Sequence, residues 1–183
     1  MVPASSFPPL FLSSLTYLLL HHFSLVASDQ DLILKTCQST QYPELCISTI
    51  NSDPLSNTSI TKGLAEIVIQ KVKESASATS LYLLNLQFKN GVNPEFQRMV
   101  RLCSDMYANA SKAFDESRKA LRIYQYNLAR LEVKAAKLYP KDCGDAFRGT
   151  IRLTYPVMLV KREELVEHLC DVISGILNVL FRF

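Results

Sequence analysis

The residues of this chain best suited to covalent chemistry are its five cysteines. Their positions are Cys37, Cys46, Cys103, Cys143 and Cys170. No two of them form a Cys-x-x-Cys and no pair of histidines lies nearby, so the sequence offers neither a zinc finger nor a thioredoxin-like redox centre. We expect no metal and no cofactor. In an oxidising compartment two pairs would form disulfides, and one thiol would be left over.

Other groups that could support catalysis are few. Beyond residue 28 the only histidine is His168. On a helix, His168 and Cys170 point to different faces, so they do not form a Cys–His dyad. Glu163 and Glu167 share a face, but the neighbouring Lys and Arg favour a solvated, charged surface over a pair of catalytic acids. The known hydrolase and phosphate-loop motifs do not occur either. We therefore expect no catalytic residue and no enzymatic activity.

Composition limits the remaining classes of function. The 183 residues are 48% hydrophobic and 20% charged, with a net charge of +3, which excludes a disordered chain and a multi-span membrane protein. Basic and acidic side chains are interleaved, so no nucleic-acid partner is expected.

The N-terminal segment, 1–28, has the pattern of a secretory signal peptide cleaved after Ser28. It lacks Asp, Glu, Lys and Arg and contains an apolar run over 10–20. That run is short for a spanning helix, so an uncleaved anchor is the less favoured alternative. After cleavage we expect no contact with the membrane.

The mature chain, 29–183, has the pattern of long helices. Glycine is scarce, and apolar residues recur every three or four positions between prolines. Four long helices are predicted, around 60–84, 96–124, 128–138 and 165–180. The stripe that we expect to face the bundle in the third helix consists of Leu128, Leu131, Ala135 and Leu138. Pro140 is expected to kink or shorten that helix.

Two short helical pieces, 29–37 and 44–51, precede the long helices. Cys37 and Cys46 lie one on each piece, so a disulfide can close this small hairpin. We therefore expect an all-α protein, an up-and-down four-helix bundle with an N-terminal disulfide-closed helical hairpin. The expected boundaries are 29–56 for the hairpin and 57–183 for the bundle.

The remaining cysteines fall on the long helices. In the loop-entropy model a hairpin ring contributes ~2–3 kcal/mol, whereas a Cys103–Cys143 bridge, which closes about forty residues, would contribute ~4 kcal/mol. Cys170 shares a helical line with Val166 and Ile173, so we expect it to be a buried, inert thiol.

Three cysteine-centred motifs resemble those of one family, the plant inhibitors of pectin methylesterase and invertase. The motifs are Thr36-Cys37-Gln-Ser-Thr-Gln-Tyr42-Pro43-Glu-Leu-Cys46, Cys103-Ser-Asp-Met-Tyr107-Ala-Asn-Ala110 and Cys143-Gly-Asp145-Ala-Phe147. The resemblance covers the whole mature chain. It implies disulfides Cys37–Cys46 and Cys103–Cys143, with Cys170 free. It also implies a stoichiometric complex that covers the substrate cleft of a cell-wall carbohydrate-active enzyme, in the apoplast or, as an alternative, the vacuole.

The target within that family is less directly indicated. Some invertase inhibitors carry Pro-Lys-Phe just after the second bundle helix, where this chain has Tyr126-Asn127-Leu128. An acidic cleft gains from a cation that this triplet does not supply, which favours a pectin methylesterase. Invertase is the alternative target. A helical ligand-binding or receptor-interaction module with no enzyme target is a second alternative.

The family's binding surface lies on bundle helices two to four, but no motif identifies its residues here. By charge alone the candidates are Lys112, Arg118, Lys119 and Arg122, and a solvated face is the preferred interpretation of them.

Two triplets fit the N-glycosylation pattern, at Asn57 and Asn109. Asn57 follows Pro54 in a polar loop and is the better candidate. Asn109 flanks the seam of a predicted helix, where a glycan would crowd the packing unless the side chain turns outward.

Overall fold

The computed structural model describes residues 30–58, 60–88 and 93–181. The expected signal peptide lies outside the described residues. The described chain begins with a helix over 30–38, followed by α2 (Pro43–Asn51), which together form a hairpin. A 3-10 turn, η1 (Ser56–Thr58), leads from this hairpin toward the bundle.

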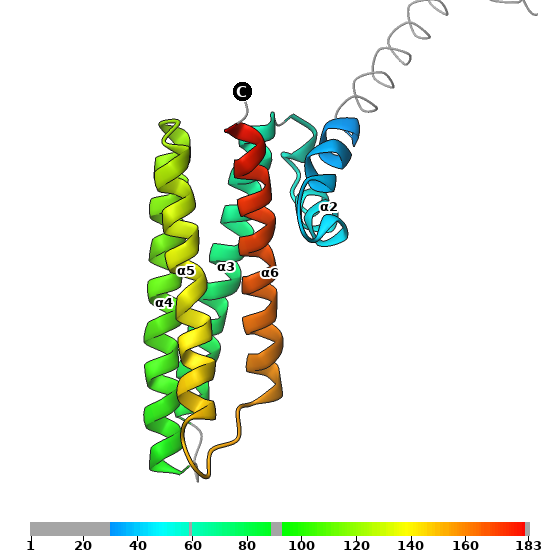
Figure 1. The fold of residues 1–183 in the computed structure, drawn as a ribbon. Helices are drawn as coiled ribbons and strands as arrows, with labels where there is room; N and C mark the ends of the chain where they lie inside the picture. The colour runs from blue at the N-terminus through cyan, green and yellow to red at the C-terminus, as the bar shows by residue number, and fades with distance from the viewer. Residues whose placement is uncertain (1–29, 59, 89–92, 182–183) are drawn as a thin grey trace, which may run out of the picture.

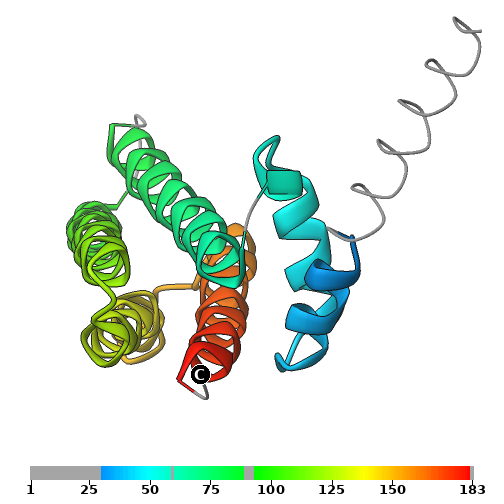
Figure 2. The same ribbon diagram turned by 90° about the horizontal axis from the view of Figure 1, so that it is seen from above.

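Four long helices form the body of the protein. They are α3 (Thr61–Gln87), α4 (Pro94–Arg122), α5 (Tyr126–Arg148) and α6 (Val157–Leu180). They run alternately up and down (Figure 1), and no strand occurs among the described residues. In Figure 2 the hairpin lies outside the four-helix bundle, beside α6. The structure is therefore the all-α bundle with an N-terminal hairpin that the sequence predicts.

Helix α4 shows why this sequence forms bundle helices. Its first turn contains Pro94, whose missing N–H costs nothing at this position, and the Asn93 side chain accepts a hydrogen bond from the Glu95 backbone N–H at 2.8 Å. The buried residues of this helix recur every three or four positions and so form one face. Its buried residues are Met99, Val100, Cys103, Ser104, Tyr107, Ala110, Phe114, Ser117, Ala120 and Leu121.

The expected core stripe of α5 is wrong. The α5 residues that face the core are Ala129, Val133, Ala136, Pro140, Cys143, Gly144 and Phe147. Most of them are small, so α5 packs close to its neighbours. A polar bond accompanies this contact, since the buried Ser117 hydroxyl of α4 donates to the Ala129 carbonyl at 2.9 Å. The leucines that the periodicity assigned to the core consequently point outward.

Of the two effects expected of Pro140, a kink or a shortened helix, the shortening does not occur. The helix runs without interruption from Tyr126 to Arg148, with Pro140 buried inside it. Proline removes one backbone hydrogen bond there. Packing of the apolar ring and the disulfide at Cys143, less than one turn later, hold the helix on both sides of this defect.

Two disulfides are present in the structure. Cys37–Cys46, here called the hairpin disulfide, joins the two arms of the hairpin. Cys103–Cys143, the bundle disulfide, joins α4 to α5. The fifth cysteine, Cys170, is free and buried in α6.

The hairpin docks on α6 through two close contacts. Tyr42 stacks on His168, with ring centroids 4.1 Å apart. Two helical turns later along α6, Gly175 lies against Thr40, and a Cβ on Gly175 would be 2.9 Å from the Thr40 Cα. His168 thus positions the hairpin, in a stack that involves no nucleophile.

Candidate interaction surface

An apolar stripe runs along the outer face of α5. It consists of Leu128, Leu131, Ala135 and Leu138, all exposed, and we call it the α5 stripe. Leu131 is 61% exposed and Leu138 56% exposed. Three leucines on one line, over three turns of a helix, make a continuous apolar patch, and such patches mark interaction sites more often than single exposed leucines do.

A column of four cations lies next to this stripe, on the side of α5 that faces α6. It consists of Arg130, Lys134, Lys137 and Lys141, spaced i, i+4, i+7 and i+11, and spans about 16 Å of helix. Lys137 donates to Asp171 of α6 at 2.7 Å. Burial lowers the pKa of the Lys137 ammonium, but the hydrogen bond and charge of Asp171 outweigh burial and raise this pKa.

The other three members of this basic column have no ion-pair partner among the described residues. Arg130 contacts Asn178 and the Phe181 ring instead. Lys134, Lys137 and Lys141 line a groove of about 670 Å³ between α5 and α6, together with Leu138, Ala135 and Glu167. The groove therefore has an apolar floor and a mainly cationic rim, which is complementary to an acidic surface.

The corner between α4 and α5 extends this surface at one end of the bundle. Tyr124 has a φ of 61°, in the left-handed region that side chains other than glycine rarely adopt, and its ring is 67% exposed. Lys62, from the start of α3, lies with its Nζ 4.0 Å from the centre of that ring. Tyr126 contacts Tyr124 and Phe181 edge-on. A cation and an exposed aromatic ring are thus presented together.

The cations that the sequence proposed on α4 are mostly neutralised. Arg118 bonds Gln70 and Asp115, and Lys119 pairs with Glu116. Arg122 likewise pairs with Glu66 of α3, and only Lys112 has no ion-pair partner among the described residues. Asp115 also accepts from Lys73 at 2.8 Å, and this hydrogen bond holds the pKa of its carboxyl below 3.8. The face is the solvated, self-paired surface that the sequence favoured.

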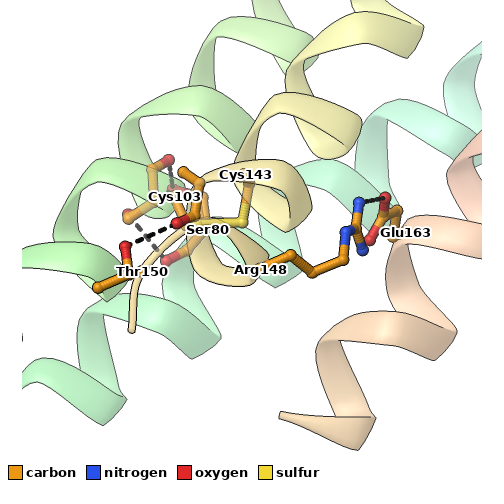
Figure 3. Close-up of a disulfide and its surroundings, with 8 residues drawn as sticks. Ser80, Cys103, Cys143, Arg148, Thr150 and Glu163 are labelled. Carbon is orange, nitrogen blue, oxygen red and sulfur yellow. Dashed lines mark hydrogen bonds and ion pairs between the residues drawn. A yellow bond between two sulfur atoms is a disulfide. The ribbon is translucent and has the colours of Figure 1, made fainter. Parts of the chain in front are cut away.

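Glu163 corrects another expectation, because it does not lie on a solvated face. Its residue exposure is 7%. Figure 3 shows Arg148 of α5 reaching Glu163 of α6 beside the bundle disulfide, with Nη2 and Oε1 3.3 Å apart. Gly144 makes this approach feasible, since a Cβ there would lie 2.5 Å from the Glu163 Oε2. Glu167, one turn on, is half-buried at the α5–α6 groove.

The buried Tyr107 hydroxyl lies near this carboxylate. Burial, together with the negative charge of Glu163, raises the pKa of Tyr107 far above its normal value. Burial does the same to the thiol of Cys170. Burial therefore favours the neutral form of both groups.

No cluster of three or more His, Cys, Asp or Glu in the described part of the chain could hold a metal ion. Within residues 30–58, 60–88 and 93–181, the helices are also too short or too polar to cross a membrane. Asn57 and Asn109 are both exposed.

Comparison with known proteins gives a family and a fold. Residues 31–176 match the model of the family described as plant invertase/pectin methylesterase inhibitor. The chain is 33% identical over 177 residues to "Cell wall / vacuolar inhibitor of fructosidase 2" of Arabidopsis thaliana, which covers 97% of this chain and 98% of the relative.

The chain is also 30% identical over 156 residues to "Pectinesterase inhibitor 28" of Oryza sativa subsp. japonica. That match covers 81% of this chain and 69% of the relative. Among solved structures, a mutant form of a pectin methylesterase inhibitor from Arabidopsis superposes with a TM-score of 0.64. It covers 78% of this chain and 92% of that one, at 22% identity. This last likeness concerns the fold.

Proposed function

The chain belongs to the plant invertase/pectin methylesterase inhibitor family and is an enzyme inhibitor, not an enzyme; we propose that its target is a secreted or vacuolar β-fructofuranosidase, whose substrate cleft it covers in a stoichiometric complex. A pectin methylesterase is the second candidate. The protein acts in the cell wall or vacuole after removal of the segment 1–28.

The observation that carries this proposal is the α5 stripe beside its basic column. A retaining or inverting glycoside hydrolase has two carboxyl groups flanking the bond that it cleaves, so its cleft is acidic. A rigid helix that offers leucines for burial and unpaired cations on one side fits such a cleft. The bundle disulfide ties α5 to α4 and keeps this surface preorganised, which lowers the ordering cost of binding.

The choice of a fructosidase over a pectin methylesterase rests on the α4–α5 corner. The sequence argument against invertase was that Tyr126-Asn127-Leu128 brings no cation and no phenylalanine. Those three residues form the first turn of α5, and the corner just before them presents Lys62 against the exposed Tyr124 ring. The corner therefore has a cation that comes from another helix. The 33% identity to a fructosidase inhibitor over nearly the whole chain supports the same choice.

The second candidate is favoured by different observations. Relatives named pectinesterase inhibitor match at 30% and 29% identity, close to the first figure. The α5 stripe itself does not distinguish between the two targets. Both targets are therefore tested side by side.

The experiment titrates one purified β-fructofuranosidase and one pectin methylesterase with the disulfide-intact protein at the acidic pH of the wall. Leu131→Glu places a charge in the α5 stripe and should weaken inhibition at least about tenfold. Leu102→Glu is the matched control, because Leu102 is an exposed leucine of α4 outside this surface. Equal losses in both variants would refute the role of the α5 stripe.

The corner is tested separately. Lys62→Ala and Tyr124→Ala should each weaken inhibition of the fructosidase while thermal stability changes little. Inhibition of the pectin methylesterase alone, by the unchanged protein, would reverse the assignment of the target.

A further inference from the structure

We propose that Asn109 carries an N-linked glycan, which covers the outer face of α4 and leaves the α5 surface open to a target. The second half of this statement rests on the proposed inhibitor function. The first half is independent of it.

The orientation of the triplet Asn109-Ala110-Ser111 removes the packing objection. Ala110 is fully buried in the bundle, and the Ser111 hydroxyl is hydrogen-bonded to that of Ser77 on α3 at 2.8 Å. Asn109 is the member of the triplet that points to solvent. Its amide makes no hydrogen bond to any described residue, so a sugar attached to it would displace no contact of the fold.

The surroundings of Asn109 have room for a large polar group. Leu102 and Glu116 lie two turns before and after it on the same helical line, and both are exposed. Asp105 and Lys112, the nearest neighbours on this face, are exposed as well. A glycan is bulky and strongly hydrated, so it would occupy the middle of this outer face of α4.

The modification itself is a group transfer to the Asn109 side chain. The Nδ2 atom forms a bond to C1 of the first N-acetylglucosamine of a lipid-linked oligosaccharide diphosphate. The bond from C1 to the diphosphate oxygen breaks, the lipid diphosphate leaves with that electron pair, and Nδ2 loses one proton. The donor is the class of lipid-linked oligosaccharide found in the secretory pathway. Transfer to the unfolded chain precedes formation of the Ser77–Ser111 hydrogen bond.

The glycan has a directional consequence for binding. Helices α4 and α5 are neighbours in the bundle (Figure 2), but their outer faces look in different directions. A carbohydrate on α4 excludes a protein surface from that face, whereas the α5 stripe and the groove toward α6 stay accessible. The glycan thereby removes the α4 side from the faces that a target can approach.

The first test maps the glycans on the full chain, expressed in and secreted from plant cells. Peptides are digested with a deglycosylating amidase, which converts a glycosylated Asn to Asp, and are analysed by mass spectrometry. We expect conversion at Asn109 in most molecules, and its loss in both Asn109→Gln and Ser111→Ala. Secreted protein with an unmodified Asn109 would overturn the proposal.

The second test moves the glycan. Glu132→Asn together with Lys134→Thr creates a triplet beside the α5 stripe, and Glu132→Gln together with Lys134→Thr is the matched control without one. We expect the relocated glycan to weaken inhibition at least about tenfold relative to its control, while the Asn109→Gln variant inhibits as well as the parent.

Tighter inhibition by the Asn109→Gln variant would place the α4 face in the interface and overturn the directional half. If the parent inhibits neither enzyme, the proposed function fails, and the peptide map still decides whether Asn109 is modified.

Discussion

Replacing Gly144 by alanine should have opposite effects in two backgrounds. In the parent protein a Cβ at this position would lie 2.5 Å from the Glu163 Oε2 and 2.7 and 2.8 Å from the Arg148 guanidinium nitrogens. The Glu163 carboxylate must move, and it then loses its bond to Arg148 while it stays buried. A hydrogen bond to a charged group contributes about 1.5–3 kcal/mol. Against this cost, replacing glycine by alanine inside a helix stabilises the folded state by about 1 kcal/mol.

The expected balance for Gly144→Ala alone is therefore a destabilisation of about 0.5–2 kcal/mol, or about 1–8 °C in the unfolding midpoint for a domain of this size. In the Glu163→Ala background the obstructing carboxylate is gone. The half-exposed Arg148 side chain can swing into solvent, so the same substitution should stabilise the protein by about 1 kcal/mol.

The measurement is thermal and urea unfolding of the four proteins of this cycle, with both disulfides intact. An Arg148→Ala background is the control, because there is no Arg148–Glu163 bond left to lose, and the substitution should be less unfavourable there than in the parent. An equal shift in the parent and Glu163→Ala backgrounds would refute the reasoning, since it would mean that Glu163 does not rest against Gly144.

Four further outcomes follow from the structure. Removing the bundle disulfide should lower the free energy of unfolding by about 1 kcal/mol more than removing the hairpin disulfide, because its ring is longer; equal midpoints would contradict this. Gly175→Ala should push the hairpin away from Thr40, which faster hydrogen exchange in the hairpin alone would reveal. The pKa of the Asp115 carboxyl is lowered in the folded state. Its stabilising effect is therefore complete above the normal pKa of 3.8 and is lost as the pH falls through the pKa of the folded state. Over that pH range, the difference in unfolding midpoint between the parent and Asp115→Asn should shrink. The Cys170 thiol, whose pKa burial raises, should resist alkylation at pH 8 until the protein is unfolded.

Sequence periodicity predicted the bundle because three of its helices have one apolar face each. Helix α5 has two. Its inner face is built of alanine, valine, proline and glycine, and its outer face carries leucines. A rule that assigns the larger apolar residues to the core selects the outer face. Only the packing of α5 against α4 and α6 shows which of its two faces is buried.

Charge was harder to interpret than hydrophobicity. The cations Arg118, Lys119 and Arg122 meet their partners on α3 or one turn away, and long-range pairs such as Arg122–Glu66 cannot be derived from one sequence. The column Arg130, Lys134, Lys137 and Lys141 is visible as a spacing. Its significance comes from the scarcity of acidic partners across the groove, which is a property of the assembled bundle.

The small residues on the inner face of α5 determine how stably the helix packs, whereas the residues on its outer face determine which partner it can bind. Because α5 is held by close backbone packing and by a disulfide, its outer leucines contribute little to folding. Substitutions there can accumulate without unfolding the chain, whereas a substitution on the inner face is removed by selection for stability. A protein built in this way can acquire a new target by drift on one exposed line of a helix.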